Sequence, residues 1–328
     1  MEKFRTEIEI PPSDNKISHQ SKGMLIGSCF SEYIGELMVR YKFDVDINPT
    51  GILYNPSSVS TCLQALMEQK EYKKKDLFEI NGKFVSFDHH GSFSDPDPEE
   101  CLRKINERIR KASDQLAKAT YIIITFGTAW IYRLADSGRI VSNNHKLPAR
   151  YFNRELLTVE YILDHYRQLI QDLRKINPDI RFIFTVSPVR HWKDGATQNT
   201  VSKSILILAI HELVSQFDSA GYFPAYELAM DDLRDYRFYA EDMIHPNSQM
   251  TEYIWRKFSG TYFNEKTVRL IQNLESINKA RDHKPFHPGS EEHKQFLNKQ
   301  LELVEDLKMN HPYLDLSAEK EYFRNQLK

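Results

Sequence analysis

The chain of 328 residues has few cysteines, no long apolar run and no apolar leader. Its three cysteines form no CxxC pair, so the sequence offers neither a disulfide scaffold nor a cysteine zinc site. A mean hydropathy of −0.56, with no apolar stretch near 18 residues, argues against a membrane-spanning helix. The first residues, MEKFRTEIEIPPSDNK, carry charges where a secretory signal needs apolar residues. These absences predict a cytoplasmic protein that does not enter a membrane.

An excess of charge of one sign is also missing. The chain has 44 basic and 46 acidic residues, a formal net charge of −2. Such a balance creates no general basic field for nucleic acid, and the run Lys73-Lys74-Lys75 is typical of a solvated loop. Hydrophobic residues make up 41% of the chain, which is typical of a globular protein.

Apolar patterns along the first 262 residues alternate between strand-like and helical spacing. Uninterrupted apolar runs predict buried strands, 3.6-residue periodicity predicts helices, and Asn81-Gly82 marks a hairpin turn. Strands are predicted at 24–26, 43–47, 121–126, 181–186 and 222–226, hairpins at 78–85 and 130–141, and helices at 31–41, from 57 (capped by Ser57 or Ser58), 97–119, 158–176, 201–217 and 248–258. This order predicts a flavodoxin-like three-layer α/β/α sandwich over residues 1–262, with a mostly parallel sheet of about five strands.

Residues 263–328 differ in composition. They are charged, contain a His-Lys-Pro-Phe-His-Pro break at 283–288, and show helical but no strand patterns. They predict a helical C-terminal extension that packs on the first domain or forms a homo-oligomer with a second copy.

The first predicted strand ends in Gly27-Ser28-Cys29-Phe30, directly before a helix. A thiol at a helix N-terminus is expected to have a lowered pKa, which would make Cys29 a nucleophile. The alternative is a small buried cysteine in a turn, the role that the apolar patterns around Cys62 and Cys101 predict for those two residues.

A second polar group precedes the last predicted helix, in Asp242-Met243-Ile244-His245-Pro246-Asn247. His245 could take a proton from the nucleophile while Asp242 bonds its Nδ1 and fixes the tautomer. A helix cap would explain Asn247 or Ser248 but not the spacing of Asp242 and His245.

Several segments together resemble a known family. LIGSCFSEYIGELM, INPTGILYNP, FDHHGSFSD, TFGTAWIYRL, TVSPVRHWKDG and DDLRDYRFYAEDMIHPN, spread over about residues 22–260, are similar to the bacterial GSCFA family, and the first and last blocks resemble the SGNH (GDSL-type) hydrolase superfamily. The resemblance implies the SGNH hydrolase fold and an acyl-enzyme on Cys29 or Ser28, with His245 as base and Asp242 orienting it. Aligning the first blocks by their glycines favours Cys29.

The resemblance also locates the rest of the site. The superfamily's oxyanion-binding Asn is missing where Gly127-Thr128-Ala129 follows the central strand, so backbone N–H groups at Cys29 and Gly51, with the Thr128 hydroxyl, are the expected replacements. Asn48 and Gly51 correspond to the superfamily's glycine block.

Further basic residues are expected at the same edge of the sheet. Arg190 and His191 could bind a carboxylate or phosphate, and His89 and His145 could line the pocket. As an alternative, a metal could be held by a subset of His89, His90, His145, His191 and Asp242, although their spacing matches no metal motif.

The sequence therefore predicts an esterase that needs no cofactor and acts on a small-molecule or glycan acyl ester. An acyltransferase with a CoA-type donor and a non-catalytic ligand-binding protein remain alternatives.

Overall fold

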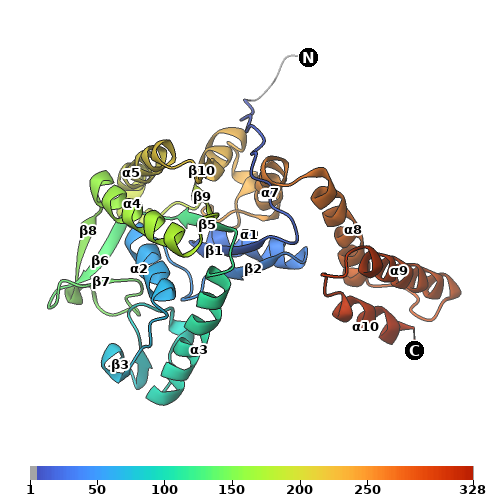
Figure 1. Ribbon diagram of the computed structural model, residues 1–328, viewed down its shortest axis with the longest axis horizontal. Helices are drawn as coiled ribbons and strands as arrows, with labels where there is room; N and C mark the ends of the chain where they lie inside the picture. Colours follow the sequence, from blue (N-terminus) through green and yellow to red (C-terminus); the bar gives the residue numbers. More distant parts are fainter. Residues whose placement is uncertain (1–5, 328) are drawn as a thin grey trace.

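Five parallel strands form the central sheet of the protein, which a computed structural model describes for residues 6–327 (Figure 1). The strand order is β10-β9-β5-β1-β2, and every neighbouring pair is parallel. The strands are β1 (Lys22–Gly27), β2 (Asp44–Ile47), β5 (Tyr121–Phe126), β9 (Arg181–Val186) and β10 (Ala220–Phe223). The order of the strands reverses between β1 and β5, and ligands of such sheets bind beyond the carboxyl ends of the strands at this point. The predicted α/β class and the five-stranded parallel sheet are confirmed.

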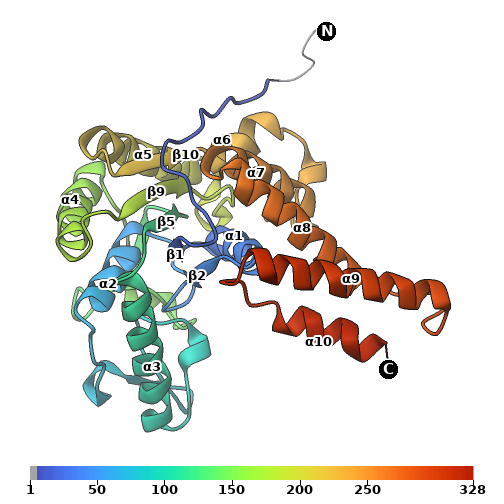
Figure 2. The same ribbon diagram turned by 45° about the vertical axis from the view of Figure 1, so that its right-hand side comes forward.

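Helices cover both faces of this sheet, as Figures 1 and 2 show. On one face lie α2 (Pro56–Met67), α3 (Pro98–Leu116), α4 (Val159–Ile176) and α5 (Gly195–Gln216); on the other lie α1 (Cys29–Arg40), the short α6 (Ala225–Glu227) and α7 (Ser248–Tyr262). Side chains of β1 alternate between the two cores: Met24 and Ile26 pack with the first group, and Leu25 with the second. Each such buried side chain stabilises the fold by ~1.5–3 kcal/mol.

Two smaller sheets stand beside the carboxyl edge of the main one. The hairpin of β3 (Phe78–Ile80) and β4 (Lys83–Val85) was predicted, as was the pairing of β6 (Trp130–Leu134) with β7 (Ile140–Val141). The third strand of the second sheet, β8 (Phe152–Leu156), was not predicted. Its sequence FNREL has no strong strand pattern, and it becomes a strand by pairing with β6 along its whole length.

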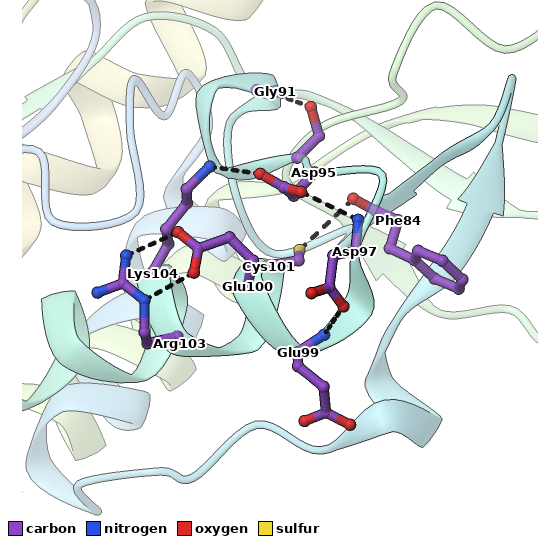
Figure 3. Close-up of polar contacts among 10 residues, drawn as sticks. Phe84, Gly91, Asp95, Asp97, Glu99, Glu100, Cys101, Arg103 and Lys104 are labelled. Atoms are coloured by element: carbon purple, nitrogen blue, oxygen red, sulfur yellow. Dashed lines mark hydrogen bonds and ion pairs between the residues drawn. The ribbon is translucent and has the colours of Figure 1, made fainter.

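The start of α3 holds the hairpin in place (Figure 3). The Asp97 side chain caps the helix by accepting from the Glu99 N–H at 2.9 Å, and Lys104 bonds the Asp95 carboxylate at 2.7 Å. The Cys101 thiol donates to the carbonyl of Phe84 in β4 at 3.4 Å. These contacts hold the β3–β4 hairpin and residues 86–95, which follow it, against α3. The hairpin therefore has a fixed position beside the carboxyl ends of the main strands.

Three helices follow the α/β domain: α8 (Glu265–Asp282), α9 (Glu291–Asn310) and α10 (Ser317–Gln326). In Figures 1 and 2, α9 and α10 project to one side of the domain. Apolar residues of α8 complete the core on the α1 and α7 face. Glu319, only 2% exposed, pairs with Lys42 just after α1 at 2.7 Å. The extension is thus attached at the end of α1 that is remote from Cys29.

Several helices start at residues other than those that the sequence predicts, and α5 begins at Gly195 rather than at 201. The cap of α2 is Asn55, not Ser57 or Ser58, because Pro56 takes the first helical position and Asn55 accepts from the Ser58 N–H. Helix α1 starts at Cys29 rather than near Ser31, so Cys29 itself is the first helical residue. Within residues 6–327, no helix is long and apolar enough to cross a membrane.

Candidate active site

The turn between β1 and α1 separates the two candidate nucleophiles. Gly27 has φ +138°, and a Cβ there would lie 2.1 Å from the Thr125 carbonyl oxygen, so only glycine fits. Ser28 is 1% exposed and caps α1, with its Oγ accepting from the Phe30 N–H at 3.3 Å. Cys29, one residue further, is partly exposed and lines a cavity. The structure therefore brings Cys29, and not Ser28, to open space.

This cavity, about 1140 Å³ in volume, lies at the carboxyl edge of the main sheet. The loops after β1, β2, β5 and β9 form one side, the loop before α7 contributes His245, and the two smaller sheets form the opposite wall. Of the predicted site residues, those lining it are Cys29, Thr128, His145, Arg190, His191 and His245, whereas Ser28, Asn48, Gly51, His89, Gly127 and Asp242 are not part of the lining.

The predicted activation of the Cys29 thiol by a lowered pKa is wrong. Burial and then the charge of Glu32 raise the pKa of Cys29, and the backbone N–H groups of Cys29 and Phe30, with Lys203, oppose this only in part. A helix N-terminus alone would lower the pKa of the thiol, but the depth to which the thiol is buried depends on the tertiary structure and does not show in the sequence. Cys29 is therefore protonated near neutral pH and would need a base to react.

Asp242 and His245 bond each other in the loop that precedes α7. His245 Nδ1 is 2.5 Å from Asp242 Oδ2, and Oδ1 accepts from the backbone N–H groups of Ile244 and His245 at 3.0 and 2.9 Å. The backbone and side-chain hydrogen bonds of His245, then the Ile244 N–H, lower the pKa of Asp242 to about 2. An ionised Asp242 holds the proton of His245 on Nδ1 and leaves Nε2 as an acceptor.

The charge of Asp242 acts on the first turns of α1. Burial raises the pKa of the Tyr33 phenol, and the nearby charges of Cys29 and, more weakly, Asp242 raise it further. Tyr33 is one turn after Cys29 in α1, and Cys29 and His245 line the same cavity. Asn247 caps α7 by accepting from the Met250 N–H, as the sequence suggested for Asn247 or Ser248.

Two of the expected oxyanion donors are already engaged. The Gly51 N–H donates to the Asn48 carbonyl at 2.8 Å, and Gly51, at φ +90°, packs against His90 rather than facing the cavity. The Asn48 side chain accepts from the Gly27 N–H at 2.9 Å and so joins the loop after β2 to the β1 turn. The Thr128 hydroxyl lies 3.0 Å from Ser202 Oγ and accepts from the Trp130 N–H. The prediction that Gly51 contributes to the oxyanion hole is wrong because its N–H closes a turn.

Asn55 is a residue that the sequence analysis missed. It lines the cavity together with Cys29, and its Oδ1 is bound by the Ser58 N–H at 2.8 Å. The side-chain NH₂ is the part left to face the cavity. The signal in the sequence was Asn55-Pro56 at the start of a helix that begins at the carboxyl edge of the sheet.

His191 and the backbone of Gly127 lie in close contact. A Cβ on Gly127 would be 3.2 Å from His191 Nε2 and 3.4 Å from the Ser28 Cβ, so glycine allows the ring to approach the β1 turn. Burial, then the charges of Lys203, Arg154 and His245, lower the pKa of His191 to about 4. His191 is therefore neutral at pH 7.

A second residue that sequence reasoning missed is Lys203 of α5. It is 1% exposed, and its Nζ donates to the carbonyls of Gly127 and Ser187 at 2.7 Å each. Burial lowers its pKa to about 7, partly offset by Cys29. Lys203 thus ties together the loops after β5 and β9.

The two remaining predicted histidines have structural partners. His89 is buried, does not line the cavity and bonds Ser86 Oγ at 2.9 Å. His145 lines the cavity, and its Nε2 donates to the Ser86 carbonyl at 2.8 Å. The alternative metal site is not supported, since the described residues contain no group of three or more His, Cys, Asp or Glu side chains placed to hold an ion.

Comparison with known proteins gives a family and a distant structural neighbour. The GSCFA family matches residues 22–258, and the C-terminal domain of GSCFA domain proteins matches residues 274–328. A comparison with curated proteins found no match. Among solved structures, a carbohydrate esterase family 3 protein from Talaromyces cellulolyticus is similar with a TM-score of 0.33 and 11% identity, covering 77% of this chain and 99% of that chain.

Proposed function

The chain belongs to the GSCFA family, and we propose that it hydrolyses acyl esters through a covalent acyl-enzyme on Cys29. One observation carries the proposal. A partly exposed thiol at the start of α1 and an imidazole whose Nδ1 is bonded to a carboxylate line the same cavity, at the carboxyl edge of a parallel sheet. A nucleophile, a base and a group that orients the base are the parts that acyl transfer requires.

In the first half of the reaction, His245 Nε2 takes the Cys29 proton, and Sγ attacks the carbonyl carbon of the ester. The negative charge that develops on the carbonyl oxygen is stabilised by the Cys29 N–H and the Asn55 side-chain NH₂. The C–O bond then breaks, and the leaving alkoxide takes the proton from His245. The products of this half are an alcohol and a thioester on Cys29.

In the second half, His245 takes a proton from water, and the resulting hydroxide attacks the thioester carbon. The C–S bond breaks, the acid leaves, and the thiolate recovers its proton from His245. Because burial raises the pKa of Cys29, the reaction depends on His245 more strongly than it would with a preformed thiolate.

The decisive experiment is intact-mass detection of the acyl-enzyme after exposure to p-nitrophenyl acetate. We expect one acetyl group on the protein, absent in Cys29→Ala and slower to form in Cys29→Ser, because a hydroxyl needs a stronger base than a thiol. Ser28→Ala is the matched control on the neighbouring residue. It should acylate at a similar rate and lose only the cap hydrogen bond, ~1 kcal/mol of stability.

An essential Ser28 with a dispensable Cys29 would overturn the assignment of the nucleophile. Absence of any acyl-enzyme with short activated esters, in a folded protein that still binds ligands, would favour a non-catalytic binding role.

Acyl transfer to an acceptor other than water is a second candidate. The cavity of about 1140 Å³ is larger than a short ester needs, since pockets for small molecules usually enclose ~300–1000 Å³. A cysteine thioester also exchanges readily with other thiols, as expected for a CoA-type donor. Acceptor dependence separates the two reactions: a transferase releases p-nitrophenol faster when coenzyme A is added, and a hydrolase does not.

A further inference from the structure

The lining of the cavity carries charge of only one sign. Among the described residues that line it, none is Asp or Glu, whereas five are Lys or Arg, although the whole chain has a net charge of −2. The five are Lys83, Lys146, Arg154, Arg190 and Lys193. A concave surface whose lining carries an excess of positive charge concentrates anions.

Two of these cations differ in whether a carboxylate neutralises their charge. Arg154 is paired with Asp194, which lies outside the lining. Arg190 is half-buried, and its Nη2 contacts the Met230 sulfur at 3.3 Å; within residues 6–327 it takes part in no ion pair. A partly desolvated guanidinium with a thioether as its neighbour lacks the carboxylate that usually offsets such burial.

Lys193 extends the same charge toward the second wall. Its Nζ bonds the Tyr132 hydroxyl of β6, a neutral partner that leaves the positive charge uncompensated. Trp192, between the two cations in sequence, is 47% exposed and also lines the cavity. Residues 190–193 of the loop after β9 thus present two cations, Arg190 and Lys193, and the aromatic face of Trp192.

We propose that Arg190 and Lys193 bind a phosphate or carboxylate group of the substrate, so that the enzyme acts on acyl esters or thioesters of organic anions. This inference rests on the proposed function, because it places the anion in the cavity that contains the Cys29 thiol. The bound anion positions the acyl carbon at Cys29, and the Trp192 face covers the apolar part that joins the two.

A pair of alkylating reagents tests the subsite without a known substrate. Iodoacetate and iodoacetamide form the same C–S bond with Cys29 and release iodide, but only iodoacetate is an anion. The measured quantity is the ratio of their rates at Cys29, by peptide mass spectrometry, divided by the same ratio for glutathione. We expect this normalised ratio to be about tenfold above one at low ionic strength.

Variants connect the ratio to the proposed residues. Arg190→Met and Lys193→Met should each lower the ratio several-fold. Lys193 is exposed, so its replacement gives a folded protein even if loss of Arg190 disturbs the loop. Arg181→Met, the same substitution at the opposite end of β9, should leave the ratio unchanged. A wild-type ratio at or below that of glutathione, or an equal effect of Arg190→Met and Arg181→Met, overturns the subsite.

If Cys29 reacts with neither alkylating reagent, anion binding to the subsite is measured directly. That outcome would refute the proposed nucleophile, and the subsite would then be decided by tryptophan fluorescence during titration with pyrophosphate or malonate. A change that Arg190→Met abolishes supports the subsite, and the stronger of the two ligands identifies the anion as phosphate or carboxylate. No change with either ligand refutes it.

Discussion

Asn55 has two roles that substitution can separate. Its Oδ1 caps α2 by accepting from the Ser58 N–H, and its NH₂ is left to face the cavity. Asn55→Ser keeps a strong cap and removes the amide donor, Asn55→Ala removes both, and Asn55→Asp keeps the cap but places a carboxylate where an oxyanion would form. We expect all three variants to form the acyl-enzyme more slowly.

The expected magnitudes differ between the two roles. Loss of one oxyanion donor costs ~10²–10³ in rate, whereas loss of a cap costs ~1 kcal/mol of stability. A domain of ordinary stability, ~5–15 kcal/mol, stays folded after such a loss. Asn55→Ser should therefore react ~10²–10³ more slowly at unchanged stability, and Asn55→Ala should react as slowly while also unfolding more easily. Asn55→Asp should be the slowest, because its charge opposes both the oxyanion and the Cys29 thiolate.

The assay is pre-steady-state release of p-nitrophenol from p-nitrophenyl acetate, combined with urea unfolding of each variant. An Asn55→Ser protein that acylates within about threefold of the wild-type rate would refute the donor role. Loss of activity in proportion to loss of stability across the series would refute it too, since Asn55 would then act only through the helix cap.

The remaining predictions concern the other groups of the site. Iodoacetamide should label Cys29 before the buried Cys62 and Cys101. Equal labelling of all three in the folded protein would contradict the placement of Cys29 in an accessible cavity. Glu32→Gln should lower the pKa of Cys29, because the charge of Glu32 raises it, and should move the labelling-rate curve to lower pH; Glu160→Gln, the same substitution in the first turn of α4, should not move it. Asp242→Asn should slow acyl-enzyme formation by ~10²–10⁴, through loss of the fixed His245 tautomer, and an unchanged rate would remove Asp242 from the mechanism. Deletion of 264–328 should lower the free energy of unfolding by at least ~3 kcal/mol, because α8 buries apolar side chains against the domain, while Cys29 labelling in the remaining folded fraction should persist.

The parallel sheet could be predicted because its strands are short apolar runs whose local pattern already reflects their burial. Strand β8 could not, since FNREL becomes a strand only through pairing with β6, which is distant from it in sequence. The same distinction applies to the site. Asp242 and His245 are three residues apart, so their contact could be expected from spacing alone. The hydrogen bond from Gly51, by contrast, depends on how the loop after β2 turns, and Lys203 lies in a helix whose pattern reveals nothing about its two carbonyl partners.

Burial explains why Ser28 and Cys29 are not interchangeable. The residue before α1 must present an oxygen to the Phe30 N–H, and it is buried close to the backbone of Gly127. A hydroxyl fits this position because it is small and accepts a strong hydrogen bond, while a thiol is a weak acceptor. The next residue starts the helix and lines the cavity, where burial raises the pKa of the thiol and the proposed mechanism has His245 take its proton. The order Ser-Cys thus places the better cap at the helix start and, under the proposed function, the better nucleophile in the cavity.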